Sequence, residues 1–311
     1  MSIRDALFRC YIRLSGYKPK IFTSAEKKEL IPKMIEANRK QERDVLTSEK
    51  SFLQNLSVRS LALGNCGAWL LTKETNPSKK IIYYIHGGGF TGACTKERMR
   101  FISTMVNGLG YNVFSIDYRL APEFPFPAAL EDCLEGYRWL LKNFDAKDIV
   151  FVGESAGGNL AITLSMLARD KALPLPQAVY ANSAPTQFDE ITESYRRFAL
   201  KTDFVVTDTI LENNEEVCFE KKDVKNPYLS PLYGHLDALP PMTLSASQCE
   251  CLFDDSLMFY GALKAAGNQA TFLSYPGLWH AFIMSPQNHR IVKEAYPDFI
   301  AFLNKNFGEG K

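Results

Sequence analysis

The chain has 311 residues, 46% of them hydrophobic, so it is long enough to bury a large core in one domain, with or without a lid. Its 36 basic and 35 acidic residues leave a formal charge of +1, and no basic run is long enough to grip phosphates, which argues against a nucleic-acid partner. Uninterrupted apolar stretches reach only five or six residues, far short of the roughly 20 that a membrane span needs, so we expect no stable membrane insertion.

Cysteine usage and the first residues favour a cytoplasmic protein. The seven cysteines are irregularly spaced, which suits reduced thiols better than a disulfide framework. The N-terminal ALFRCYIRL is interrupted by Arg9 and Arg13 and lacks a small-residue cleavage site, so it makes a poor signal peptide. Cys249 and Cys251 have no second ligand pair at a zinc-site spacing, and the sequence therefore predicts no metal site.

The periodicity predicts an α/β fold. Residues 1–50 are amphipathic and helical in pattern, and short β-rich runs begin with a hairpin over 58–63 and 67–72. Further strands are predicted at 80–86, 111–117, 148–152, 177–182, 242–247 and 270–275, and helices at 128–143, 156–169, 254–266 and 286–306. Apolar strands that alternate with helices predict a mostly parallel sheet with helices on both faces. The interval 183–240 breaks the alternation and is predicted to be an insertion above the sheet.

The predicted strand at 148–152 runs into GESAGG and then into a helix, which is the context of a nucleophile elbow. In such an elbow, glycines such as Gly153 and Gly157 leave room for a strained turn that exposes the serine, here Ser155. A glycine-rich helix entry with an incidental serine is the alternative interpretation.

The strand at 80–86 ends in HGGGF, residues 86–90. Acyl transfer places negative charge on a carbonyl oxygen, and backbone N–H groups must already point at that oxygen. Gly88 and Gly89, with the amide of Ala156 after the serine, are the candidates for this oxyanion hole. A phosphate-binding loop is the alternative, but no helix opens directly after HGGGF and no Lys-Ser/Thr pair follows it.

A serine nucleophile needs a neutral imidazole within hydrogen-bond reach, and the chain has four histidines. His86 belongs to the glycine loop, His235 to a loop expected to be solvated, and His289 to the last predicted helix. His280 follows the final predicted strand in YPGLWHAF, at a carboxyl end, and is therefore the candidate base.

The stretch ASQCECLFDDS supplies three candidates for the carboxylate that orients His280. Glu250 stands three residues beyond the strand at 242–247, and the chain order of serine, acid and histidine suits an α/β-hydrolase. Asp254 and Asp255 lie at the start of the next predicted helix, where an N-cap and a favourable first-turn charge are the ordinary roles. Glu250 is therefore the predicted acid.

Together these motifs resemble the hormone-sensitive-lipase-like branch of the α/β-hydrolases, also called bacterial family IV esterases. The resemblance covers most of residues 58–307 and rests on HGGGF, GESAGGN, DYRLAPEFPFPAALED, NPYLSPLYGHLDALPPM and YPGLWHAF, in the family's order. It implies an α/β-hydrolase fold with an eight-stranded sheet in a catalytic domain of residues 51–311. A helical cap would come from the helices of residues 1–50 and an insertion at about 183–225.

The resemblance also implies hydrolysis of short-chain carboxylic esters without a metal or organic cofactor. Ser155, His280 and Glu250 would form the triad, while Gly88, Gly89 and Ala156 would hold the oxyanion. Three positions depart from the family: Phe124 stands where many relatives have His, and Glu250-Cys251 stands where the family usually has Asp-Pro. Two alternatives stay open: a deacetylase of acetylated sugars or natural products, and an inactive protein that binds a small molecule.

The substrate pocket is the least determined part of the prediction. Aromatic residues of the cap and the glycine loop are candidates for its lining: Phe22, Phe90, Phe188, Tyr195, Phe198 and Phe204. Packing inside the cap is the alternative role for those of the cap. Members of the family often pair through the last strand, so a homodimer through 270–275 is a further expectation.

Overall fold

The computed structural model describes residues 32–33, 36–37, 40, 53, 55–74, 78–199, 201, 203, 218–219, 223–286 and 288–308. The predicted cap over residues 1–50 lies almost entirely outside these ranges, as do Phe22, Phe204 and most of the predicted insertion beyond residue 203. The five described positions in residues 1–50 are helical and exposed.

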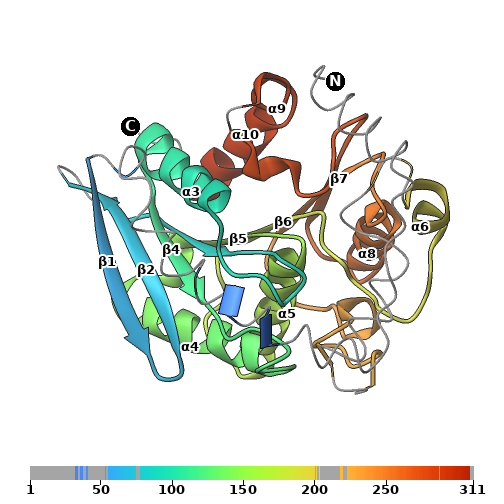
Figure 1. Ribbon diagram of the computed structural model, residues 1–311, viewed down its shortest axis with the longest axis horizontal. Helices are drawn as coiled ribbons and strands as arrows, with labels where there is room; N and C mark the ends of the chain where they lie inside the picture. Colours follow the sequence, from blue (N-terminus) through green and yellow to red (C-terminus); the bar gives the residue numbers. More distant parts are fainter. Residues whose placement is uncertain are drawn as a thin grey trace.

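The described strands form an eight-stranded sheet in the order β1-β2-β4-β3-β5-β6-β7-β8 (Figure 1). The strands are β1 Leu56–Leu63, β2 Cys66–Lys73, β3 Ile81–Ile85, β4 Asn112–Asp117, β5 Ile149–Glu154, β6 Ala178–Asn182, β7 Met242–Ser247 and β8 Ala270–Tyr275. β2 pairs antiparallel with both β1 and β4, and the remaining neighbours are parallel. The mostly parallel sheet that begins with an antiparallel hairpin is confirmed.

Helices cover both faces of the sheet (Figure 1). Those of the described chain are α3 Lys96–Leu109, α4 Ala128–Asn143, α5 Ala156–Asp170, α6 Glu193–Phe198, α8 Phe253–Ala265, α9 His289–Glu294 and α10 Tyr296–Phe307. Short 3-10 turns occupy Ala146–Asp148, Pro231–Tyr233 and Phe282–Met284. No helix in the described part of the chain has the length and apolar character to cross a membrane.

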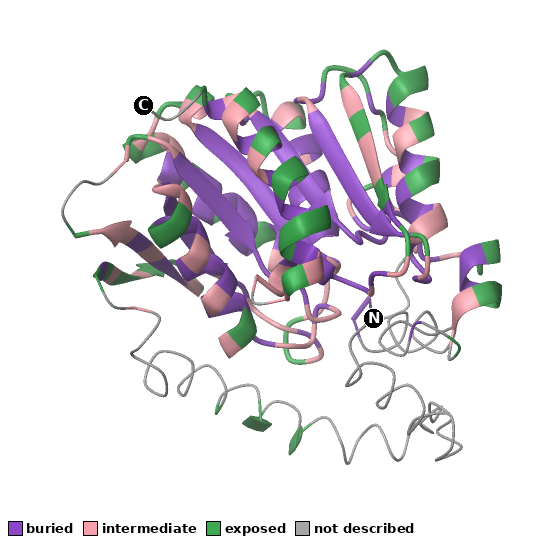
Figure 2. Cartoon of the chain, turned by 90° about the horizontal axis from the view of Figure 1, so that it is seen from above, coloured by how far each residue is buried: buried purple, intermediate pink, exposed green. Residues whose placement is uncertain are grey.

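The sheet separates two layers of core, as the alternation of side chains along a strand requires. On β3, Tyr83 faces the core shared with α4, α5 and α8, whereas Tyr84 faces the core shared with α3, α9 and α10. All five residues of β3 are buried, and Figure 2 shows the central strands buried beneath helices that are exposed on their outer sides. A continuous apolar run is therefore what a central strand with two covered faces needs.

Two helices differ from the sequence prediction. The single helix expected over 286–306 is divided at Ala295, because Pro297 falls in the first turn of α10, where its missing N–H costs no hydrogen bond. Helix α3 is absent from the elements that the sequence predicts. Its apolar stripe is diluted by Arg98 and Ser103, which are both buried.

The register of the parallel strands determines which loops meet. Ile85 pairs with Gly153, so the loops that follow β3 and β5 leave the sheet side by side. Ser247 pairs with Tyr275, so the loops after β7 and β8 also leave together. The carboxyl ends of these strands therefore bring the chemically interesting loops to one edge of the sheet.

Candidate active site

Ser155 lies at the sharp turn between β5 and α5. Its backbone has φ 56° and ψ −126°, a positive-φ conformation that a non-glycine residue adopts only under strain. A Cβ at Gly157 would overlap the carbonyl oxygen of Ile85, and a Cβ at Gly153 would overlap that of Gly157. Both glycines of the predicted elbow are therefore required by close backbone approach, and the strained turn leaves Ser155 half-buried at the surface.

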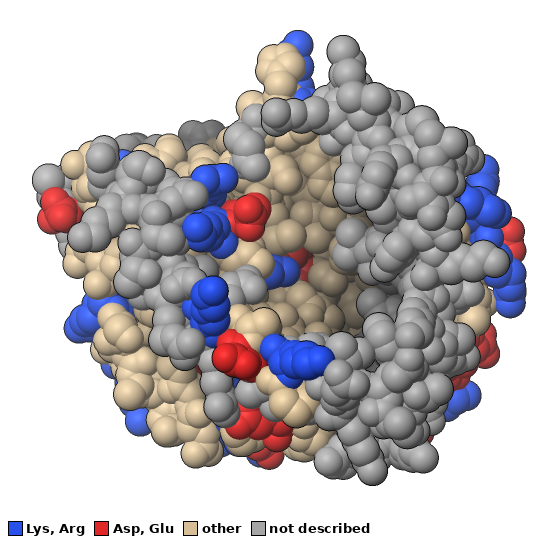
Figure 3. Space-filling model, in the orientation of Figure 1, with Lys and Arg blue, Asp and Glu red and all other residues tan. Residues whose placement is uncertain are grey.

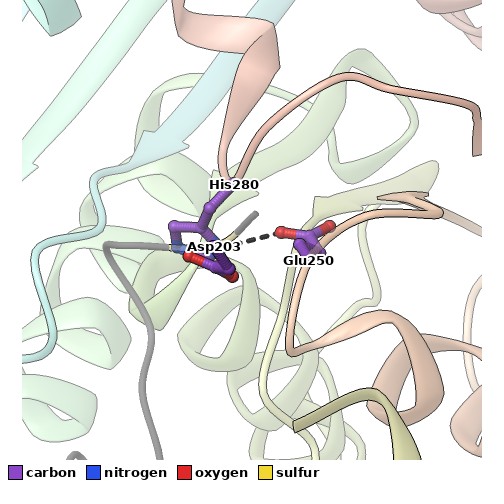
Figure 4. Close-up of side chains that lie close together, drawn as sticks. All are labelled: Asp203, Glu250 and His280. Atoms are coloured by element: carbon purple, nitrogen blue, oxygen red, sulfur yellow. Dashed lines mark hydrogen bonds and ion pairs between the residues drawn. The ribbon is translucent and has the colours of Figure 1, made fainter. Parts of the chain in front are cut away.

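Ser155, His280 and Glu250 form one chain of hydrogen bonds. His280 Nδ1 lies 2.8 Å from Glu250 Oε2, and Nε2 lies 2.9 Å from Ser155 Oγ. A carboxylate only accepts, so the proton of a neutral ring belongs on Nδ1, and Nε2 then accepts from the serine hydroxyl. Figure 4 shows the Glu250 and His280 side chains pointing toward each other. This tautomer can remove a proton from Ser155.

Glu250 is held by contacts that the sequence does not reveal. Its Oε1 accepts the Ser183 hydroxyl at 2.9 Å and the Ser247 amide at 2.8 Å. The Ser183 hydroxyl oxygen also accepts the amide of Ala281 at 3.0 Å, so one side chain fixes both the acid and the residue after His280. Ser183 directly follows β6 with φ 52°, but nothing in its sequence context distinguishes it from an ordinary loop serine.

Burial and charge act in opposite senses on this pair. Burial works to lower the pKa of His280, but the hydrogen bond and charge of Glu250, with the charge of Asp203, outweigh it and raise that pKa. Burial raises the pKa of Glu250, and the hydrogen bond from His280 offsets only part of that effect. Both side chains are almost fully buried, so a protonated His280 ring would depend on these carboxylates rather than on water for stabilisation.

The two other candidate acids point elsewhere. Asp254 accepts the amide of Ser194 at 2.7 Å and so stabilises the first turn of α6. Asp255 accepts the amide of Thr186 at 3.0 Å, and burial raises its pKa to about 7. The predicted N-cap role is wrong, because Leu252 occupies that position, whereas the predicted first-turn placement of both aspartates is confirmed.

The glycine loop after β3 has the conformation that exposes backbone amides. Gly88 and Gly89 have φ of 119° and 61°, and a Cβ at Gly88 would come within 2.7 Å of the Gly92 carbonyl oxygen. Among the residues that the structure describes, the amides of Gly88 and Gly89 donate to no other group. Ala156 is the first residue of α5, where an amide has no intrahelical partner. These amides remain the candidates for an oxyanion hole.

A buried ion pair anchors this loop to the elbow. Glu154 accepts the amide of Gly87 at 2.7 Å, the Arg98 guanidinium at 2.7 Å and the Tyr84 hydroxyl at 2.9 Å. The Glu154 and Arg98 side chains are 1% and 9% exposed. Glu154 immediately precedes the candidate nucleophile Ser155. Its carboxylate therefore links the glycine loop to the end of β5, where the elbow begins. Neither member of the pair is predicted from the sequence, since Arg98 lies on the unpredicted helix α3.

We expect Glu154→Gln to lower the free energy of unfolding by about 3 kcal/mol or more, because it leaves the Arg98 charge buried without a partner. The matched control is Glu135→Gln, which removes the ion pair between Glu135 and Arg138. The Glu135 side chain is 51% exposed and the Arg138 side chain 44% exposed. That change should cost about 0.5 kcal/mol or less. Urea unfolding of both variants measures the difference, and equal losses would contradict the anchoring role.

His86 has a structural place, as the sequence leads us to expect. Its ring stacks on Tyr118 with centroids 4.3 Å apart, and Nδ1 donates to the carbonyl oxygen of Gly87 at 2.8 Å. Burial and the nearby Arg98 charge lower its pKa to about 3, so it stays neutral. The hydroxyl of Ser155 is bonded to the ring of His280 instead.

The predicted pocket aromatics divide into two groups. Phe90 and Phe188 pack with Phe219 in a buried cluster, with ring centroids 4.9 to 6.1 Å apart. Phe90 and Phe219 also line a small apolar cavity beside the first turn of α5. Tyr195 is buried and Phe198 half-buried, both against the core, which favours the packing role for them. Figure 3 shows the face of the molecule that is turned to the viewer in Figure 1, and this face is hollowed near its centre. The described atoms that line the hollow are mostly uncharged. The hollow lies in front of the region where Figure 1 draws β5, β6 and α5.

Asp203, Glu250 and His280 form a group of three possible metal ligands. However, both ring nitrogens of His280 are already hydrogen bonded, to Glu250 and to Ser155. The two carboxylates and the ring are therefore better explained as one charge network than as a coordination sphere.

A sequence profile of the α/β hydrolase fold family matches residues 82–284, which include the glycine loop, the elbow and the three residues of the hydrogen-bond chain. A crystal structure of an esterase from the bacterial hormone-sensitive lipase family aligns over 99% of each chain, with a TM-score of 0.82 and 25% identity. The chain belongs to the hormone-sensitive-lipase-like α/β-hydrolases.

Curated relatives agree with this family membership. An acetyl-hydrolase of Streptomyces hygroscopicus is 29% identical over 257 residues, covering 80% of this chain and 83% of the relative. An arylesterase of Saccharolobus solfataricus is 30% identical over 71% of this chain and 73% of the relative. This member of the hormone-sensitive-lipase-like family is therefore a carboxylic ester hydrolase, and the predicted enzyme class is confirmed.

Proposed function

We propose that this hormone-sensitive-lipase-like enzyme hydrolyses short-chain acyl esters through an acyl-enzyme formed on Ser155. The observation that carries the proposal is the unbroken hydrogen-bond chain from Ser155 through His280 to Glu250. This series of hydrogen bonds ends at Ser155, which lies at a strained turn. The glycine loop lies beside it, and its Gly88 and Gly89 amides have no acceptor among the described residues. No other histidine of the described chain has this arrangement.

The geometry supports a two-step reaction. His280 Nε2 takes the proton of Ser155 as its oxygen attacks the ester carbonyl, and the imidazolium then protonates the leaving alcohol. Glu250 holds the ring and stabilises its positive charge. The amides of Gly88, Gly89 and Ala156 donate to the developing oxyanion. A water molecule activated by the same histidine then cleaves the acyl-enzyme, which releases the acid and restores the serine.

Short acyl groups fit the aromatic surroundings of the glycine loop. Phe90 directly follows Gly89 and is buried against Phe188 and Phe219, and the cavity that Phe90 and Phe219 line is small. An acetyl ester would need the least space beside these rings. The similarity to an acetyl-hydrolase favours acetylated compounds as one substrate class within the same mechanism.

A series of p-nitrophenyl esters tests this proposal. We expect kcat/KM to be largest for acetate to butyrate and to fall by about tenfold or more at laurate. Each added methylene changes binding by a limited amount, but a long acyl chain would collide with the phenylalanine rings of the cluster. The Phe188→Ala variant, which opens the cluster, should move the preference toward longer chains. A wild-type preference for laurate would contradict short-chain specificity, and no hydrolysis of any ester would contradict the function.

The pH dependence follows from the base. His280 must be neutral to accept the serine proton, so kcat/KM should rise as the pH passes upward through its pKa. From the sequence alone we expect a midpoint of about 6 to 7, near the ordinary imidazole value. Because Glu250 and Asp203 raise the pKa of His280, the rise should lie above the ordinary value. Stopped-flow or plate kinetics between pH 5 and 9 measures it, and a flat profile would exclude a histidine base.

A further inference from the structure

Asp203 is a buried carboxylate that reaches the site from outside the core strands. It lies in the segment between β6 and β7 and is only 3% exposed. Its backbone amide donates to the Phe198 carbonyl at 3.1 Å, and it forms an isolated bridge with Ala199. These contacts hold Asp203 close to the C-terminal end of α6.

The side chain of Asp203 faces the loop that carries Glu250. Its Oδ2 accepts the amide of Cys251 at 2.9 Å, one residue after Glu250. A hydrogen bond from a backbone N–H favours the ionised form of a carboxylate. The bond also fixes where the charge stands relative to the acid and the histidine.

Asp203, Glu250 and His280 approach one another closely. An oxygen of each carboxylate and a ring nitrogen of His280 all lie within 4.8 Å of one another (Figure 4). Two negative charges at this separation from one imidazole, in a site that water barely reaches, favour the protonated ring. The groups that raise the pKa of His280 are Glu250, Asp203 and, more weakly, Glu154. Of these, Asp203 has no role in the mechanism described so far.

We propose that Asp203 is a positioning residue that acts through His280, as a second carboxylate that stabilises the imidazolium formed during acyl transfer. The proposal rests on the function proposed for Ser155, His280 and Glu250. Glu250 sets the tautomer and direction of the ring through its hydrogen bond, whereas Asp203 contributes charge. Because Asp203 belongs to the connection between β6 and β7, the electrostatics of the histidine then depend on a residue that lies outside the strands of the sheet.

The test compares Asp203→Asn with Asp223→Asn in the intact enzyme, using p-nitrophenyl acetate between pH 5 and 9. Asparagine keeps an oxygen that can accept the Cys251 amide but removes the charge. Asp223 lies further along the same β6–β7 segment and is exposed, and its side chain accepts the backbone amide of Lys225 two residues on, so it serves as the control.

We expect Asp203→Asn to lower kcat by about tenfold at pH 8, with KM changed by about twofold or less. The rising limb of the pH profile should move to lower pH, so the loss should shrink as the pH falls. Asp203→Glu should restore most of the rate, and Asp223→Asn should match the wild type. A loss that is equal at every pH, or a profile that does not move, would overturn the proposal.

Two further variants keep the outcome decisive. If Asp203→Asn does not fold, Asp203→Ser supplies a neutral acceptor of smaller size and the same comparison. In the Glu250→Gln background, removing the Asp203 charge should lower the residual rate further, because both carboxylates act on one ring. Failure of the proposed function would give a different result. Ser155→Ala would then retain esterase activity, regardless of the effect of the Asp203 variants on kcat.

Discussion

Replacing Ser155 by alanine should lower the turnover of a short-chain ester by about 10⁴-fold or more. The hydroxyl is the group that His280 Nε2 contacts at 2.9 Å, and no other hydroxyl contacts that nitrogen in the described part of the chain. Ser155 is half-buried, and removal of its Oγ leaves the elbow backbone and both glycines unchanged. The variant should therefore fold like the wild type and fail only in acyl transfer.

A covalent organophosphate separates loss of the nucleophile from loss of structure. The reagent should label the wild type at Ser155 alone, as read by peptide mass spectrometry, and should not label Ser155→Ala. Ser165→Ala is the matched control, since Ser165 lies buried on α5, the helix that follows Ser155, and its hydroxyl donates to the Ile162 carbonyl at 2.7 Å. Labelling that persists in Ser155→Ala would show that another residue is the nucleophile.

The sequence predicts the sheet well because the relevant signals are local. The buried residues of β3 and the apolar run of β5 are continuous in the chain, so their pattern reveals strands covered on both faces. The sequence prediction missed the division between α9 and α10, before Pro297, and it missed helix α3. Both errors have the same cause, because each feature depends on tertiary contacts that the local sequence pattern does not contain. Pro297 is compatible with a helix start as well as a break, and Arg98 is buried only because Glu154 is there to meet it.

The candidate site divides in the same way. Ser155 and the glycines of residues 87–89 occur in compact motifs, and His280 and Glu250 could be ranked by their distance from predicted strand ends. The supporting residues could not be found, because their partners are distant in sequence: Ser183 meets Glu250 across 67 residues, and Arg98 meets Glu154 across 56. A lone serine or arginine carries no signal until the fold provides its partner.

Replacing Glu250 by glutamine should lower kcat by about 10²- to 10⁴-fold without unfolding the protein. The physical reason lies in the two oxygens of the carboxylate. Oε1 accepts from Ser183 and Ser247, while Oε2 accepts from His280. An amide has only one oxygen. The Ser183 hydroxyl and the Ser247 amide both donate to the Oε1 position, so they keep that oxygen on their side.

The amide nitrogen introduced by Glu250→Gln would then face His280 Nδ1, and two donors cannot share a hydrogen bond. The ring can relieve this conflict by moving its proton to Nε2, but that nitrogen can then no longer accept from Ser155. The variant would thus hold the histidine in the tautomer that cannot act as the base, in addition to losing the charge that stabilises the imidazolium. KM should change little, since the carboxylate is buried behind the ring.

Asp254→Asn is the matched control, because it neutralises an acid four residues away in the same loop and helix start. Asp254 contacts the Ser194 amide rather than His280, so the variant should lose about 1 kcal/mol or less of unfolding free energy and keep its turnover. Steady-state kinetics and urea unfolding on the same preparations give both quantities. If Asp254→Asn impairs kcat more than Glu250→Gln does, Glu250 is not the acid that orients His280.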